Sequence, residues 1–388
     1  MQYTARQEKD FWELDTESTD ISDVLEVLNA NFRTFGEGLQ AVMEKKAGHP
    51  ISDPKQHLKE RCQIANIDIK KIASDNTLKN WFEGGLRPKK GEDSRYKMFA
   101  IAYALGLNVE ETTALFHSVY LDRAFNRRNY KELIHYYCLR SAFSFSEAEA
   151  LISSVHLENS TSADTTLYTA VLAEEASKSS TGSKLVEYIE AHGYNFSLSN
   201  KSAKEDMLRQ KELARKIAKK KAEPYQHLMR SDKKSDRERA LSIYDPTNSR
   251  NKDTNSDNFL FSVITGQEVS LKKGTKPIVF RDDTIPKEIR SNFPKPSSFS
   301  ENNDSYEELR KAIILLFSYR FWTEAEVHNE QCDFDDYHDQ LDALLAHADL
   351  PLMYFGNPYD WLFMYCTVCP NSIDTFHDIL GEVVIEPV

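Results

Sequence analysis

The sequence predicts a mainly α-helical protein built from several domains. Apolar residues recur at intervals of three and four over most of residues 21–192 and again over residues 306–367. Glycine, proline and short polar residues separate these stretches in the manner that begins and ends helices. The chain has 388 residues, of which 40% are hydrophobic, enough apolar material for about two or three packed cores.

The first domain is expected over residues 21–125, after a flexible acidic lead-in of residues 1–20 that offers few apolar positions. One helix is expected to start after Asp20, whose side chain can cap it. A second helix, over residues 35–46, should end at Gly48, because glycine readily adopts the left-handed conformation that closes a helix.

A third helix is expected to begin at Asp53 and Pro54, which form a cap and a first-turn proline. Apolar residues at helical spacing then continue to residue 83: Leu58, Cys62, Ala65, Ile69, Ile72, Leu78, Trp81 and Phe82. The last of these stretches predicts a helix over residues 75–83, with Ser74 or Asp75 as its cap.

The rest of the chain is divided by its polar stretches. A helical middle domain is expected over residues 126–244, with a basic helix at 203–222 that ends before Pro224. Residues 245–257 have almost nothing to bury, which predicts a linker. An acidic, mainly helical C-terminal domain is expected over residues 258–388.

Within this last domain, three stretches have helical spacing: residues 306–321, 334–348 and 358–367. The segment before them is ambiguous. A short β-hairpin near residues 267–281 and a helix stopped by Gly266 both fit it, and periodicity does not separate the two.

Charge is distributed unevenly along the chain, whose net charge is −12. Residues 55–97 hold eleven lysines and arginines against six acidic residues, and residues 201–240 hold fourteen against seven. Residues 301–388 hold three basic residues against eighteen acidic ones. The acidic segment would repel phosphate and is better suited to a protein partner, whereas the two basic segments could approach nucleic acid.

The helix at residues 75–83 has the two faces that a DNA-reading helix needs. Its apolar side chains share one face and can dock on a core: Leu78, Trp81 and Phe82. Asn76, Lys79 and Asn80 lie away from that face. An asparagine amide matches adenine N6 and N7, and a lysine reaches guanine O6 and N7 or a phosphate. Thr77 lies at the flank, where it can contact a phosphate or a thymine methyl group.

The loop after Gly84 and Gly85 is basic. Arg87, Lys89 and Lys90 are suited to phosphate contacts, which fix position rather than sequence.

The stretch "LKNWFEGGLRPKKGEDSRYKMFAIAYALGLNVEE" resembles the second half of a lambda-repressor-like (Cro/CI-type, XRE-like) helix-turn-helix domain. The matching pieces stand in the order of that family: Trp81 to Gly84, Arg87-Pro88, Ile101-Ala102 and Leu105 to Leu107. The resemblance implies that residues 75–83 are the recognition helix and that the scaffold helix lies within residues 56–72. The chain departs from the family pattern in the inserted segment Gly48 to Lys55.

The resemblance implies a sequence-specific DNA-binding protein, a transcriptional regulator whose partner is double-stranded DNA and for which a homodimer is plausible. The sequence over residues 111–139 and near residues 356–366 is also similar to uncharacterised helix-turn-helix proteins of Gram-positive bacteria. An alternative is a protein-interaction module of a mobile-element or phage-defence system, which would use the helix-turn-helix fold without reading DNA. Burial of the outer face of residues 75–83 would favour that alternative.

Three other patterns in the sequence could carry chemistry. Cys366 and Cys369 have the spacing of half a zinc site, with these residues to complete it: Cys332, His338, His347 and His377. Burial in a core explains the two cysteines better. A core position also explains Cys138 and His135 better than a catalytic role does, because residues three apart share one face of an aromatic-rich helix. We therefore expect no metal, no cofactor and no enzymatic activity, since phosphate-binding loops and nucleophile motifs are missing too.

Aspartates cluster in residues 333–342, without the loop spacing of a calcium-binding hand, which favours a solvated helix face. The basic helix at 203–222 is read as an exposed helix with intrahelical ion pairs, with a second nucleic-acid surface as the alternative. Five cysteines without framework spacing, no apolar run of membrane-spanning length and an acidic start favour the cytoplasm.

Overall fold

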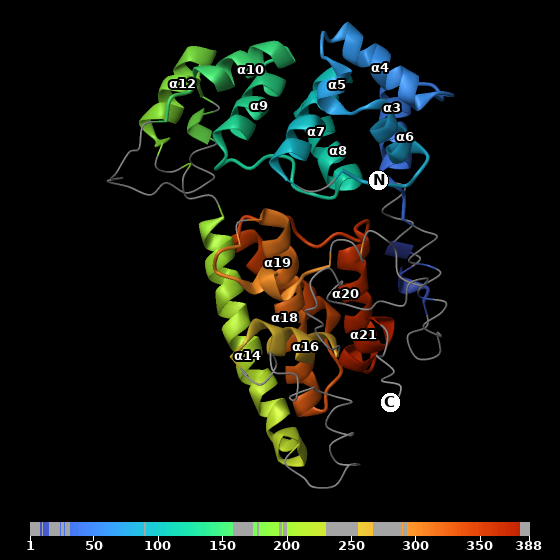
Figure 1. Cartoon of the computed structure of the whole chain (residues 1–388), viewed down its shortest axis with the longest axis vertical. Helices are drawn as coiled ribbons and strands as arrows, with labels where there is room; N and C mark the ends of the chain where they lie inside the picture. Colours follow the sequence, from blue (N-terminus) through green and yellow to red (C-terminus); the bar gives the residue numbers. More distant parts are fainter. Residues whose placement is uncertain are drawn as a thin grey trace. The chain divides into compact units, whose positions relative to one another are not determined.

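The computed structural model describes residues 8–9, 11–14, 24, 27, 32–88, 91–157, 174–176, 178–193, 196, 200–229, 255–266, 289, 293–303 and 305–380. Every regular element in these residues is a helix, which confirms the predicted mainly helical class (Figure 1). The segment 267–281, where a hairpin was one expectation, lies outside the described residues. Among the described helices, none has the length and apolar run that a bilayer crossing requires.

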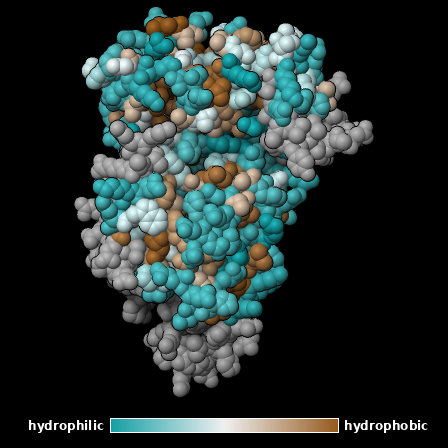
Figure 2. All heavy atoms as spheres, turned by 180° about the vertical axis from the view of Figure 1, so that it is seen from behind, coloured by the Kyte–Doolittle hydropathy of each residue, from teal (hydrophilic) through white to brown (hydrophobic). Residues whose placement is uncertain are grey.

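The chain divides into two compact units. Residues 33–201 form one, which we call the inserted unit. Residues 1–32 and 202–388 form the other, which we call the discontinuous unit because its two pieces flank the inserted unit in sequence. Hydrophilic residues predominate on the face drawn in Figure 2, with hydrophobic residues in smaller groups between them.

The discontinuous unit is built around one long helix, α18 (Tyr306–His328), which is buried over most of its length. In the part of this unit that the structure describes, the elements around it include α14 (Lys201–Met229), α16 (Asp257–Thr265), the 3-10 helix η2 (Pro296–Phe299), α19 (Phe334–His347), α20 (Pro358–Val368) and α21 (Ser372–Leu380). Three of the predicted helices are therefore present, but α18 continues beyond Phe321 to His328. This extension keeps Trp322 buried in the core.

A buried ion pair joins α18 to α20. The Arg310 guanidinium donates two hydrogen bonds of 2.7 Å to the two carboxylate oxygens of Asp360. It also donates to the backbone carbonyls of Pro351 and Leu352, at 2.8 and 2.9 Å. Both charges are thus compensated inside the core, as burial requires.

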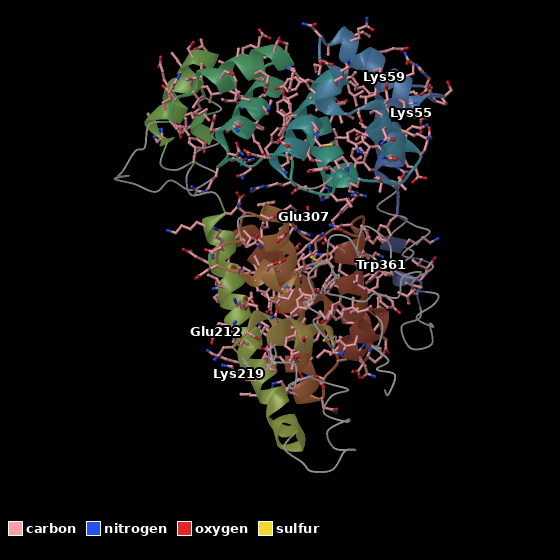
Figure 3. All side chains as sticks on the ribbon, viewed as in Figure 1. Lys55, Lys59, Glu212, Lys219, Glu307 and Trp361 are labelled. Atoms are coloured by element: carbon pink, nitrogen blue, oxygen red, sulfur yellow. The ribbon has the colours of Figure 1, made fainter. Side chains whose placement is uncertain are left out.

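The N-terminal segment contributes to the core of the same unit. Phe11 is only 2% exposed. Its ring lies 5.2 Å from Phe355, 5.6 Å from Trp361 and 5.9 Å from Phe334, centroid to centroid, and Figure 3 marks Trp361 on α20. A flexible lead-in was expected over residues 1–20, and Phe11 differs from that expectation. A lone aromatic residue gives no periodic signal, and its partners lie more than 300 positions away in sequence.

The basic helix also groups differently from the expected domains. It was expected in a middle domain of residues 126–244, separated from residues 258–388 by a linker at 245–257. In the structure, α14 packs apolar side chains into the core shared with α16 and α18: Ala203, Met207, Ala214 and Ala218. The division of the chain therefore falls near residue 201, where α14 begins, and residues 126–201 belong with the inserted unit.

The inserted unit contains two cores. The first is formed by α3 (Phe35–Ala47), α4 (Pro54–Ile64), α5 (Ile69–Ile72), α6 (Asp75–Phe82), α7 (Glu92–Ala104), α8 (Val109–Leu115) and the π-helix η1 (Phe116–Tyr120). The second is formed mainly by α9 (Tyr130–Arg140), α10 (Phe145–Ser154) and α12 (Gly182–Ala191). The helix expected over residues 35–46 is α3, and it ends at Gly48 with φ of 77°, as predicted.

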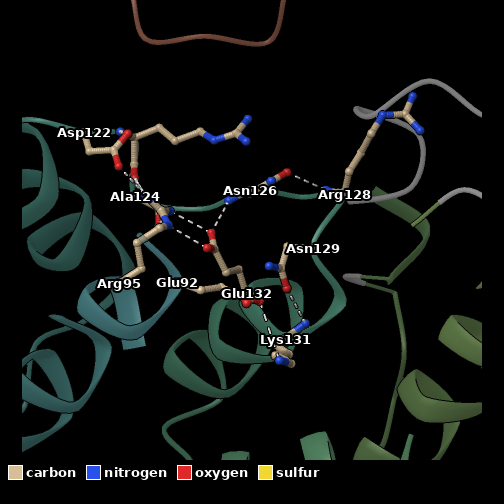
Figure 4. Close-up of polar contacts among 10 residues, drawn as sticks. Glu92, Arg95, Asp122, Ala124, Asn126, Arg128, Asn129, Lys131 and Glu132 are labelled. Atoms are coloured by element: carbon tan, nitrogen blue, oxygen red, sulfur yellow. Dashed lines mark hydrogen bonds and ion pairs between the residues drawn. The ribbon is translucent and has the colours of Figure 1, made fainter. Parts of the chain in front are cut away.

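Arg95 of α7 ties the two cores together (Figure 4). Its guanidinium donates to Glu132 of α9 through Nε at 2.6 Å and Nη2 at 2.7 Å, and to Asp122 through Nη1 at 2.7 Å. The remaining two donors reach the carbonyls of Arg123 and Ala124, at 3.0 and 3.1 Å. All five N–H groups are thus satisfied. The segment between η1 and α9 is thereby fixed to α7.

Candidate nucleic-acid interface

Helix α6 is docked by the apolar face that the sequence predicts. Ser74 caps it, with its hydroxyl accepting the Thr77 N–H at 3.2 Å. Leu78 and Trp81 are buried, and the Trp81 ring packs edge-on against Phe35 of α3 with 5.1 Å between centroids. The helix packs on α3 and α4.

Gly36 allows this close docking. A Cβ atom at this position would lie 2.3 Å from the Trp81 carbonyl oxygen and 2.7 Å from the Phe82 Cα. Backbone atoms cannot yield as a flexible side chain can, so any larger residue would push α3 and α6 apart. Sequence reasoning missed this glycine, because nothing near it in sequence indicates which helix it faces.

The predicted base-reading residues lie on the other side of α6. Asn76 and Lys79 are exposed, whereas Thr77 and Asn80 are half-buried. The Thr77 hydroxyl is within 2.9 Å of the Ser74 hydroxyl, so part of its hydrogen-bonding capacity is used at the cap. The structure therefore brings the four residues onto one short helix, with Asn76 and Lys79 the more accessible pair.

The predicted phosphate-binding loop is described only at its start. Gly85 has φ of 61°, which turns the chain after α6. Arg87 was expected on an exposed loop but is half-buried. Lys89 and Lys90 lie outside the described residues.

Two lysines of α4 flank α6, and Figure 3 labels both. The Lys59 ammonium lies 2.6 Å from a carboxylate oxygen of Asp75 at the first residue of α6, and Lys55 forms an ion pair with Glu83 just after its last residue. The hydrogen bond from Lys59 lowers the pKa of Asp75, and that from Lys55 lowers the pKa of Glu83. Neither lysine was a predicted site residue. The sequence signal that could have identified them is their spacing of four, which places both lysines on one face of a helix.

The range 56–72, in which the scaffold helix was expected, holds most of α4 and all of α5. The two are separated by Asn66, which adopts a left-handed φ of 55°, and by the buried Ile67. A new cap, Asp68, then starts α5 by accepting the Lys70 N–H at 3.0 Å. Lys70 and Lys71 of this short helix are exposed.

Several cations of the basic helix α14 form ion pairs with residues of its own unit. Lys211 and Arg215 lie 2.7 and 3.0 Å from an Asp257 carboxylate oxygen, and Lys221 pairs with Glu326. The expected intrahelical pairs are present too, for example Arg215 with Glu212 at 3.5 Å. Together with its apolar residues in the core, these pairs attach one side of α14 to its unit, so the helix is only partly exposed.

The two cysteines with the spacing of half a zinc site lie in core positions. Cys366 is fully buried and Cys369 nearly so, and burial raises the pKa of both thiols. Within the described residues, His, Cys, Asp and Glu side chains form no group of three or more that could hold a metal ion.

The neighbouring pattern in α9 is also a core feature. His135 is stacked between Phe99 and Phe145, with ring centroids 4.6 and 6.1 Å away, and burial lowers its pKa to about 3. Burial raises the pKa of the Cys138 thiol to about 12. Both side chains are therefore uncharged near neutral pH, as suits groups in a core.

Comparisons with protein-family models, with curated proteins and with solved structures found no match for this chain.

Proposed function

We propose that this protein binds double-stranded DNA sequence-specifically through α6 and acts in the cytoplasm as a transcriptional regulator. The observation that carries the proposal is the exposure of Asn76 and Lys79 on a helix whose opposite face is anchored by Leu78 and Trp81. A helix so docked can enter a major groove without disturbing the core of the unit.

In this proposal the side chains divide into two groups. Asn76 and Asn80 pair with adenine through their amides, and Lys79 contacts guanine or a phosphate. Thr77, Arg87, Lys89 and Lys90 contribute contacts that fix the position of the helix on the duplex.

Selection of bound duplexes from a random library by the full chain, at stated salt, tests the proposal. We expect an enriched sequence, and a palindrome would indicate binding as a homodimer. Asn76→Ala and Asn80→Ala should relax base preference at single positions by about 1–3 kcal/mol. Lys89→Ala should lower affinity about equally for all sequences, with a salt slope smaller by about one unit.

Lys45→Ala provides the control, because this exposed lysine lies on α3 near Glu111 of α8. Absence of any enriched sequence would reject the proposal. The alternative, a protein-interaction module with a partner at the acidic part of the chain, would then be pursued by identifying that partner. The exposure of Asn76 and Lys79 does not favour that alternative.

A further inference from the structure

The ion pairs at the ends of α6 place two ammonium groups and two carboxylates beside the face that would read DNA. Lys55 and Lys59 stand four residues apart on α4, and their partners, Glu83 and Asp75, stand at opposite ends of α6. Each end of the reading helix therefore carries a cation and its neutralising anion, from two different helices.

These pairs are open to solvent. In one pair the Asp75 side chain is 86% exposed and Lys59 is 38% exposed. In the other pair Glu83 is 48% exposed and Lys55 is 34% exposed. Exposed ion pairs contribute little to folding stability, because water solvates the separated charges well. Stability of the unit therefore gives only a weak reason for four charged residues at these positions.

A DNA phosphate approaching α6 would compete with these carboxylates. A lysine that binds a phosphate displaces about 0.9 condensed counterion from the duplex, which strengthens binding at low salt. A lysine that stays paired with a carboxylate contributes no net charge to this effect. The carboxylate also repels the phosphate directly.

Resting on the proposed function, we propose that Lys55 and Lys59 are phosphate-binding residues and that Glu83 and Asp75 are built-in competitors that weaken backbone binding. Base contacts by α6 do not depend on these lysines. The competition therefore lowers the affinity for all DNA sequences and leaves the preference among sequences unchanged. Asp75 and Glu83 thus set how strongly the protein binds the DNA backbone, without touching a base.

The test uses the full chain and the variants Asp75→Asn, Glu83→Gln and their combination. Affinity is measured across a salt series on random duplex and on the sequence selected by the wild type. The double variant should bind random duplex about tenfold tighter at low salt, with a slope of log K against log salt steeper by about two units. The ratio of specific to non-specific affinity should stay the same, because phosphate contacts strengthen binding to every sequence alike.

Glu92→Gln is the matched control, because Glu92 is an exposed carboxylate of the same unit, 3.6 Å from the ammonium of Lys131 and on another helix. Lys55→Gln and Lys59→Gln, added to the double variant, should each remove about one unit of the gained slope. Thermal melting of each variant checks that the fold is retained.

A double variant that changes binding no more than Glu92→Gln overturns the inference, even when the wild type selects a sequence and the proposed function stands. If the wild type selects no sequence but the double variant gains affinity and slope as described, the proposed function fails and the screening of Lys55 and Lys59 is supported. No binding by any variant rejects both.

Discussion

Arg95 introduces a buried charge into the inserted unit and satisfies every one of its hydrogen-bond donors there. Burial alone would lower the pKa of this guanidinium, but the charges of Glu132 and Asp122 outweigh it and raise the pKa above the ordinary value. Two buried carboxylates depend on this one cation. The network is therefore sensitive to the loss of a single side chain.

Arg95→Ala should lower the free energy of unfolding of the inserted unit by about 3–5 kcal/mol, since both carboxylates would lose their buried partner. Arg95→Lys should have an intermediate effect, because an ammonium keeps the charge but lacks the planar fork that serves four acceptor groups. Urea unfolding measures both, with the exposed Arg140→Ala as control. Equal stability of Arg95→Ala and the control would contradict the role given to the network.

His135 makes the stability of the inserted unit depend on pH. Its pKa falls from 6.5 to about 3 on burial, so between these values the unfolded chain binds a proton that the folded protein does not. Stability should therefore decrease as the pH drops from about 6.5 towards 3, by at most about 1.4 kcal/mol per pH unit for this group.

Replacing His135 by phenylalanine keeps an aromatic ring between Phe99 and Phe145 and removes the titrating group. The variant should lose this part of the pH dependence while its stability at pH 7 changes little. Urea unfolding at a series of pH values measures the difference between the two proteins. The same pH slope in both would show that another group is responsible.

At the scale of helices, the position of α6 depends on its contact with α3. Gly36→Ala should destabilise the inserted unit by about 1–3 kcal/mol, because the added Cβ meets the Trp81 carbonyl. In a helix without such a neighbour, the same substitution should stabilise by up to about 1 kcal/mol. The sign of the change in urea unfolding therefore distinguishes a close approach from a simple propensity effect. Stabilisation would contradict the close approach.

The helix ends in this region were predictable because they are decided locally. Thr34 and Asp53 cap with their own side chains, and Gly48 closes α3 with its own backbone. The docking face and the outer face of α6 also follow from spacing alone. Caps and faces depend on residues within one or two turns, which a sequence displays directly.

Contacts between distant residues were not predictable in this way. Lys55 meets Glu83 across 28 positions, and Arg95 meets Glu132 across 37. Their pairing requires the packing of α4 on α6 and of α7 on α9, which no local pattern specifies. The sequence indicated the charges of the candidate interface but left open which of them neutralise one another.

For the whole molecule, the aromatic contacts of Phe11 make residues from both ends of the described chain part of one core. Phe11→Ala should lower the stability of the discontinuous unit by about 3–5 kcal/mol, as truncation of a buried aromatic side chain does. Val327 of α18, which is 73% exposed, provides the control in Val327→Ala. Hydrogen exchange of the full chain should show faster exchange in α20 for the first variant only, with α7 unchanged in both. Faster exchange throughout the chain would mean that the two units do not unfold separately.

The interrupted course of the chain has a consequence for its synthesis. Phe11 leaves the ribosome long before Phe334, Phe355 and Trp361 are synthesised, so its ring cannot make these contacts until then. Residues 33–201, which hold both cores of the inserted unit, emerge completely in that interval. A ribosome that stalls after residue 201 would therefore release a product that carries α6 but in which the aromatic cluster around Phe11 has never formed.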